Sequence, residues 1–199
     1  MISIIHPKEE KTVVLIKPDG VKRGLIGEIV SRIERRGLKI IALEMVWATK
    51  EQIDDHYPKN EKWVKRLGEK ALKNFQDFGI DVKRELGTAD PLEIGKEVRN
   101  WLIDFMTSGP IVKMVIKGIH AIAMVRKLVG VSMPSGAEMG TIRGDFSVDD
   151  ATAANRDKRA IHNIVHASET VEEVKHELSF WFAADDIHDY KRAEEDIMF

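Results

Sequence analysis

The chain has 199 residues, of which 43% are hydrophobic, so it is long and apolar enough for one domain with a well-formed core. Its 31 basic and 33 acidic residues give a net charge of −2, so no overall basic field favours nucleic acid or an anionic membrane. The absence of cysteine excludes disulfides, thiolate nucleophiles and cysteine-ligated zinc.

No part of the sequence reads as a membrane or export signal. A membrane span needs roughly 18 uninterrupted apolar residues, and no window of the chain has them. The N-terminus also lacks the basic, apolar and small-residue order of a signal peptide. We therefore expect a cytoplasmic protein with no membrane partner.

The first part of the chain alternates strand and helix patterns. The apolar run Lys11–Ile16 predicts a buried strand, and the turn residues Lys17-Pro18-Asp19-Gly20 end it. Apolar residues recur at helical spacing from Lys22 to Arg35. Leu38–Trp47 is again typical of a strand, and Lys50–His56 of a short helix.

The pattern changes after Tyr57. Charged residues and glycines dominate 58–97, which predicts a largely helical insertion on the surface, with one or two short helices. A helix resumes over Val98–Met106, followed by a third strand over Ile111–Ile116 and a second main helix over Ile119–Leu128.

The last third of the chain begins with a segment rich in Gly, Ser, Pro and Thr, 129–145, which predicts a long ordered loop of the kind that often carries function. The polar segment 149–158 predicts a second insertion. A fourth strand should end at His166, and a helix should start at Thr170. An acidic tail, 183–199, completes the chain.

Without its insertions the predicted order is β-α-β-β-α-β, the ferredoxin-like α/β pattern, within a single domain over 1–199. We expect a four-stranded antiparallel sheet with helices covering one face. Strands one and three are central in this topology, so residues just past the strand ends can meet although they lie far apart in sequence.

His166 is the most informative residue. It follows the apolar residues Ile161, Ile164 and Val165 and precedes the small pair Ala167-Ser168, a setting that suits a nucleophile or an acid–base group. A lone histidine is more often an ordinary core or surface residue.

Three cations change that balance. Lys17 lies just past strand one and can face the same cleft as His166. Arg126 and Arg143 each offer a planar fork for phosphate oxygens, although singly each reads as an ordinary surface arginine. A histidine nucleophile beside three cations indicates phosphoryl transfer through a covalent phosphohistidine.

Six motifs in order across nearly the whole chain resemble those of the nucleoside diphosphate kinase family. They are Lys17-Pro18-Asp19-Gly20-Val21, Arg23-Gly24-Leu25-Ile26-Gly27-Glu28, His56-Tyr57, Ser108-Gly109-Pro110, Gly140-Thr141-Ile142-Arg143-Gly144-Asp145-Phe146 and Asn163-Ile164-Val165-His166-Ala167-Ser168.

The resemblance implies that His166 takes the terminal phosphoryl group of a nucleoside triphosphate, mainly ATP, and passes it to a nucleoside diphosphate. It implies that Glu177 holds the unreactive ring nitrogen of His166, with Ser168 beside that pair. Lys17 and Asn163 would contact the ribose 3′-hydroxyl, and Lys17 also the phosphates. The residues implied on the phosphate side are Tyr57, Arg126, Ser132 and Arg143.

The resemblance also implies that Mg²⁺ arrives on the nucleotide phosphates, so that no metal ligand comes from the protein. It further implies a homo-oligomer, either a hexamer or another assembly built from dimers.

The chain departs from the family pattern between Tyr57 and Ser108-Gly109-Pro110, where its spacing is far longer. Family members carry there an aromatic residue that stacks on the nucleobase, and the register places Val98 at that position, with Leu102 as the neighbouring apolar contact. Trp63, Phe75, Phe78 and Trp101 are alternative base contacts between which the sequence does not choose.

Other interpretations remain open at this point. His162 and His166 could ligate a metal on a helix, although a strand would hold the two rings far apart. A catalytically weak nucleotide-binding or regulatory module of the same fold is a second alternative. A scaffold or a nucleic-acid binder is a third, which the near-neutral charge supports poorly.

Overall fold

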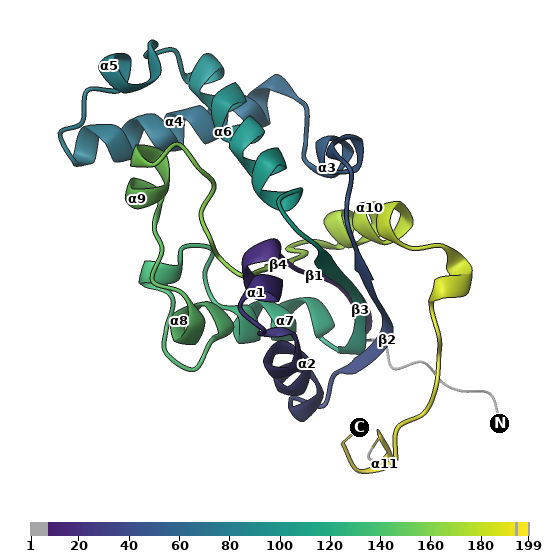
Figure 1. The fold of residues 1–199 in the computed structure, drawn as a ribbon. Coiled ribbons are helices and arrows are strands. Elements are labelled where there is room, and N and C mark those ends of the chain that lie inside the picture. The colour runs from purple at the N-terminus through teal and green to yellow at the C-terminus, as the bar shows by residue number, and fades with distance from the viewer. Residues whose placement is uncertain (1–7, 194, 199) are drawn as a thin grey trace.

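A computed structural model describes residues 8–193 and 195–198, and its described part contains a four-stranded antiparallel sheet of order β2-β3-β1-β4 (Figure 1). The central positions of β1 and β3 confirm the ferredoxin-like architecture. The strands are β1 (Glu9–Ile16), β2 (Lys39–Val46), β3 (Ile111–Ile119) and β4 (Val165–Ala167).

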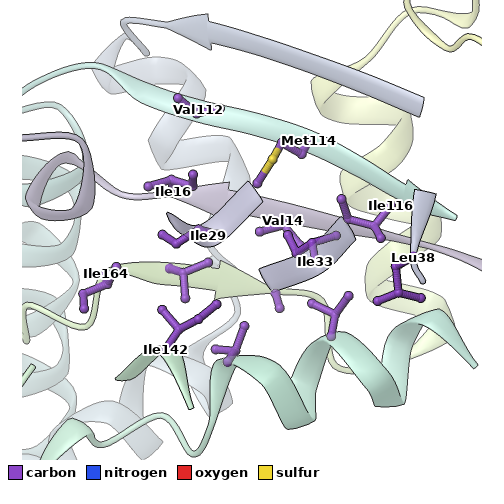
Figure 2. Packing of buried hydrophobic residues seen from close by; sticks show 14 of the residues in the cluster. Val14, Ile16, Ile29, Ile33, Leu38, Val112, Met114, Ile116, Ile142 and Ile164 are labelled. Carbon is purple, nitrogen blue, oxygen red and sulfur yellow. The ribbon is translucent and has the colours of Figure 1, made fainter. Parts of the chain in front are cut away.

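Helices α2 and α7 cover one face of the sheet. Ile29 and Ile33 of α2 and Val125 of α7 pack with Val14 and Ile16 of β1 in one buried cluster, part of which Figure 2 shows. The predicted helix over 22–35 is two helices separated by a turn. The helices on this side are α1 (Pro18–Lys22), α2 (Ile26–Arg35), α7 (Ala121–Val129) and α8 (Ile142–Phe146).

The opposite face of the sheet is also covered, so the expectation that helices cover one face is wrong. Val13 and Leu15 of β1 are fully buried in a second cluster with Ile53, Met106 and Trp181. The reason is visible in β1 itself, because its apolar run has no polar alternation and both faces must be shielded from water. This second layer consists of α3 (Lys50–His56), the C-terminal part of α6 (Pro91–Met106) and α10 (Val171–Trp181).

Residues 58–97 form a helical layer with a small core of their own, and they lie at one end of the molecule (Figure 1). They contain α4 (Glu61–Asp77), which is longer than predicted, and α5 (Val82–Leu86). The helix expected to start at Val98 begins at Pro91, because the Asp90 side chain caps it by accepting a hydrogen bond from the Leu92 amide at 2.9 Å. Helix α9 (Ala151–Arg156) contacts α4, so the two predicted insertions touch.

The acidic tail runs along the outer edge of β2. The His188 amide donates to the Ile41 carbonyl at 2.8 Å, and the Tyr190 hydroxyl donates to the Ile40 carbonyl at 3.0 Å. The tail therefore covers part of a free sheet edge. Residues 194 and 199 of this predicted segment lie outside the described residues. The remaining short helices are η1 (Pro134–Gly136), η2 (Ala184–Asp186) and α11 (Glu195–Met198).

Among the described residues, every helix is too short or too polar to cross a membrane.

Helices α4 and α6 pack closely because a glycine of each helix lies against the backbone of the other. This contact allows a test of the insertion. A Cβ added at Gly95 would collide with the Val64 carbonyl oxygen, and one at Gly68 with that of Pro91. We expect Gly95→Ala to lower the free energy of unfolding by about 1 to 3 kcal/mol, measured by urea denaturation, because the helices must separate. Gly27→Ala on α2 is the matched control, since a Cβ there meets open space. Equal stability of the two variants would contradict the tight crossing.

Candidate active site

The pairing of β1 with β4 brings the predicted site together. Leu15 lies opposite His166 in that pairing, so Lys17, just past β1, arrives beside the residues that precede His166. The Lys17 amide donates a hydrogen bond to the Ile164 carbonyl at 2.8 Å. The strand expected up to His166 differs from the observed one, because β4 spans Val165–Ala167 and His166 is its middle residue.

The backbone turns sharply at Ile164, which is why the strand starts late. Ile164 has a φ of 69°, and the Val165 amide donates to the Asn163 carbonyl at 2.7 Å across it. This three-residue turn is a γ-turn, a strained geometry for a β-branched residue that costs on the order of 1 to 3 kcal/mol. The surrounding structure must hold Ile164 in this conformation.

The His166 ring is fixed by a carboxylate on one side and partly open on the other. Its Nε2 donates to Glu177 Oε1 at 2.7 Å, and the His166 side chain is 27% exposed. Because a carboxylate only accepts, Nε2 carries the proton and Nδ1 of the neutral ring has a free lone pair. The arrangement leaves Nδ1 as the nitrogen that can act as a nucleophile.

Glu177 contacts the His166 ring, and Ser168 contacts Glu177, as the resemblance implied. The Ser168 hydroxyl donates to Glu177 Oε2 at 2.6 Å and accepts from the Val13 amide at 3.2 Å. Burial alone would raise the pKa of Glu177, but the hydrogen bonds from His166 and Ser168 outweigh it, and the net pKa is lowered. Glu177 is therefore a charged carboxylate with both oxygens engaged.

His56 is a part of the site for which no role was predicted from the sequence. Its ring meets the His166 ring edge-on, with centroids 5.3 Å apart and planes at 88°. Trp181 Nε1 donates to His56 Nδ1 at 3.3 Å, and burial followed by the nearby His166 lowers the pKa of His56 to about 3. His56 is thus a neutral group packed against the candidate nucleophile. Its only sequence signal was its place beside Tyr57 in a motif.

Lys17 and Asn163 are in direct contact, as expected for residues that share a ligand. Lys17 Nζ donates to Asn163 Oδ1 at 2.6 Å, and Asn163 Nδ2 donates to the Ser132 carbonyl at 3.0 Å. Burial lowers the pKa of Lys17 to about 8, helped by the charge of Arg143 and opposed by Asp19. Ser132 thus contributes its carbonyl to this network, and its side chain is exposed.

Arg143 lies beneath the turn that precedes His166. Its guanidinium donates to the carbonyls of Asn163 at 3.2 Å, Gly130 at 2.8 Å and Val165 at 2.6 Å, and the residue is only 4% exposed. Burial, and then the charge of Arg126, lower the pKa of Arg143 to about 10. Arg143 therefore supports the backbone around the site in addition to any contact with a ligand.

Arg126 is the more accessible of the two arginines. Its side chain is 31% exposed, and it donates to Glu169 Oε1 at 3.1 Å. Its charge helps to lower the pKa of Arg143, so the two guanidinium groups lie close enough to interact.

The residues predicted to contact the base pack against different parts of the structure. Val98 packs against the small core between α4, α5 and α6, and Leu102 packs against the cluster under the sheet. Tyr57 lies stacked on Trp63, with ring centroids 6.2 Å apart, and burial followed by Glu177 raises the pKa of its phenol. The role of Val98 beside a base stays a prediction.

The described residues contain one three-member group with metal-ligand geometry, formed by His56, His166 and Glu177, whose ligand atoms lie within 4.8 Å of one another. This group is the candidate nucleophile with its supports, and its nitrogen ligands do not suit Mg²⁺. His162 is not part of it. The His162 ring stacks on Phe105 instead, with centroids 5.0 Å apart.

Comparison with known proteins identifies close relatives. The family profile described as nucleoside diphosphate kinase matches residues 10–71 and 92–187, and its gap lies inside the predicted insertion. A curated nucleoside diphosphate kinase from Pyrobaculum aerophilum is 48% identical over 178 residues, which cover 89% of this chain and 97% of that protein.

Two solved structures extend this similarity to three dimensions. The crystal structure of an NDP kinase from Pyrobaculum aerophilum superimposes with a TM-score of 0.88 at 46% identity, covering 91% of this chain and 100% of the other. A Borrelia burgdorferi nucleoside-diphosphate kinase, in a transition-state mimic with bound vanadate and ADP, superimposes with a TM-score of 0.75 at 34% identity. That match covers 94% of this chain and 95% of the other.

Proposed function

Since this chain belongs to the nucleoside diphosphate kinase family and transfers the terminal phosphoryl group of a nucleoside triphosphate to a nucleoside diphosphate, we propose that His166 Nδ1 carries that group between the two. The resemblance predicted from the motifs is confirmed at the level of the family. The observation that supports the assignment to Nδ1 is the 2.7 Å hydrogen bond that commits Nε2 to Glu177.

The reaction divides into two displacements. In the first, the Nδ1 lone pair attacks the terminal phosphorus, an N–P bond forms, and the bond from phosphorus to the bridging oxygen breaks as the diphosphate leaves. The ring keeps its Nε2 proton, and Glu177 stabilises the positive charge that develops on the imidazole. In the second, a terminal oxygen of another diphosphate attacks the same phosphorus, and Nδ1 regains its lone pair.

Buried cations provide the electrostatic part of the catalysis. We propose that Lys17 and Asn163 bind the ribose hydroxyl and the phosphates, and that Arg126 and Arg143 spread the charge of the transferring group. Lys17 and Arg143 are already largely removed from water, so little reorganisation is needed when an anion arrives. We further propose that Tyr57 and Ser132 line the same side.

The residues around His166 fit a magnesium ion that is held by the nucleotide. Both oxygens of Glu177 are engaged by neighbours, and one oxygen of Asp19 accepts from the Ile164 amide at 2.9 Å. The neighbouring side chains are cations and amides, which contact phosphates rather than a metal. We propose that Mg²⁺ bound to the β and terminal phosphates neutralises part of their charge.

A phosphoenzyme assay tests the role of His166. After incubation with γ-labelled ATP we expect one acid-labile phosphate per chain, which a nucleoside diphosphate then removes. His166→Asn should show no label and no measurable turnover, because no other group supplies the lone pair. His162→Asn, four residues earlier, is the matched control and should keep both. A labelled His166→Asn protein would contradict the assignment, and nucleotide binding without any phosphoenzyme would favour the regulatory alternative.

The pKa of Lys17 predicts an alkaline limit to the activity. Its folded pKa is lowered to about 8, so the ammonium group loses its proton as the pH rises through that value. We expect kcat/KM to fall about tenfold per pH unit above the limit, because this ratio reports the free enzyme. Lys17→Arg should remove this alkaline fall in kcat/KM, the alkaline limb of the profile, and should also lower the activity. Lys127→Arg, on the exposed side of α7, should keep the parent's profile. A flat parent profile to pH 10 would contradict this role.

We also propose that the chain works as a cytoplasmic homo-oligomer, a hexamer or another assembly of dimers. Support comes from β2, an edge strand on which Leu43 and Met45 are 52% and 53% exposed, followed by Trp47 at 67%. A cytoplasmic location is compatible with the cysteine-free composition. Sedimentation velocity tests the assembly: we expect a mass several times 22.6 kDa, and a single species of that monomer mass would contradict the proposal.

A further inference from the structure

We propose that Asp19 is a positioning residue whose carboxylate, together with the backbone of Lys17 and the close approach of Gly20, holds the strained turn at Ile164 and thereby orients Asn163 and His166. This inference rests on the proposed roles of His166 and Lys17 in phosphoryl transfer. Asp19 itself need not touch the substrate.

The segment Lys17-Pro18-Asp19-Gly20 contacts Ile164 from three directions. Asp19 Oδ2 accepts a hydrogen bond from the Ile164 amide at 2.9 Å, and the Ile164 carbonyl accepts one from the Lys17 amide at 2.8 Å. A Cβ added at Gly20 would lie 2.8 Å from the Ile16 Cγ2 atom, 3.0 Å from the Ile164 carbonyl oxygen and 3.1 Å from the Ile164 Cγ2 atom. Both polar backbone groups of Ile164 are thus bound by one segment, and that segment has no room to spare.

This clamp is needed because Ile164 does not adopt its conformation on its own. A β-branched residue with a φ of 69° is an outlier, and the side chain is fully buried, so the turn persists only where its surroundings impose it. The Asp19 carboxylate accepts the hydrogen bond of the Ile164 amide, and so replaces the sheet partner that this amide would have in a continuous strand.

The turn sets the positions of the reactive groups on both sides of it. Asn163 lies immediately before it and holds Lys17 Nζ at 2.6 Å. Val165 lies immediately after it, and its carbonyl accepts from Arg143 at 2.6 Å. His166 follows in β4. A relaxed turn would displace Asn163 and His166 relative to each other, and small displacements of reacting groups are costly.

Asp19 also has an electrostatic effect, which can be measured separately from any effect on the stability of the fold. Among the described residues, its Oδ1 atom is buried without a hydrogen-bond partner. Its charge favours the protonated forms of Lys17 and Arg143. The charged or titratable groups that act on Lys17 are Asp19 from α1 and Arg143 from α8, and Lys17 in turn acts on His56 from α3. Loss of the Asp19 charge should therefore make Lys17 easier to deprotonate.

Three variants distinguish the clamp from the charge. The readout is the single-turnover rate of His166 phosphorylation by ATP, with the pH profile of kcat/KM. Asp19→Ala removes both the acceptor and the charge, and we expect a roughly 10- to 100-fold lower rate together with an alkaline limb at lower pH. Asp19→Asn keeps an oxygen acceptor, so we expect the same movement of the limb with a loss of less than about tenfold.

Gly20→Ala perturbs the same turn without changing a charge. We expect it to lower the phosphorylation rate by about as much as Asp19→Ala, while the alkaline limb stays at the parent's pH. Gly27→Ala and Glu28→Gln, two changes on α2 away from the turn, are the matched controls and should keep the parent's rate and profile. Thermal unfolding of every variant identifies any that do not fold, and Gly20→Ala and Asp19→Asn then test the proposal by independent routes.

Wild-type and His166→Asn proteins are assayed in parallel, and they show whether His166 is phosphorylated. The proposed role of His166 and the proposed role of Asp19 can therefore fail separately. With a labelled wild type, a parental rate in folded Asp19→Ala overturns the clamp. Equal losses in Asp19→Ala and Asp19→Asn, with a parental rate in Gly20→Ala, also overturn it, because the charge alone would then carry the effect.

Discussion

The pairing of β1 with β4 is the constraint on which the active site depends. It joins three residue pairs, with Leu15 opposite His166 at its centre. Because Val13 to Ile16 of β1 are fully buried on both faces, a slip of one residue would exchange their side chains between the two layers and turn His166 toward the other layer. The register that places Lys17 beside Asn163 and Ser168 beside Val13 is therefore enforced by the hydrophobic core, not by the polar contacts within the site.

Within that frame, burial tunes the charges in a consistent direction. It lowers the pKa of Lys17 to about 8 and that of Arg143 to about 10, and it keeps His56 neutral with a pKa of about 3. The cations are thus partly deprived of water and favour an anionic ligand, whereas the ring beside the nucleophile adds no positive charge to it. In the proposed mechanism, Glu177 is the carboxylate that compensates for the charge developing on His166. Such a site stabilises the transferring phosphoryl group with charged groups that are already in place, so these groups need not move during the reaction.

Much of this arrangement could be predicted from the sequence, because strand order follows from topology and the motif residues lie at strand ends. Lys17 contacts Asn163, and both His166 and Ser168 contact Glu177, as expected. The γ-turn could not be predicted, since the apolar residues around Ile164 favour a strand and only tertiary contacts oppose that preference.

Other errors have similarly local causes. The apolar run of β1 did not reveal that a second helical layer covers it, because a run buried on two faces gives no alternation to read. Asp19 and His56 were visible as motif members, but their functions lie in hydrogen bonds and ring contacts with residues more than a hundred positions away. Ser132 was expected to act through its hydroxyl, which stays a prediction, and its carbonyl accepts a hydrogen bond from Asn163 Nδ2.

Helix α6 explains how the long helical segment can be accommodated without disturbing the chemistry. Its first half packs Ile94 into the core shared with α4, and its last turn packs Met106 under the sheet, so one continuous helix belongs to both layers. Arg99, between these halves, donates to Asp54 Oδ1 at 2.5 Å and to the Tyr57 carbonyl at 3.3 Å, which ties α6 to the end of α3. His56 lies at that same end. The orientation of the added layer is thus transmitted by a rigid element to the ring that packs against His166, while Arg143 lies in α8, whose Ile142 packs against the opposite face of the sheet.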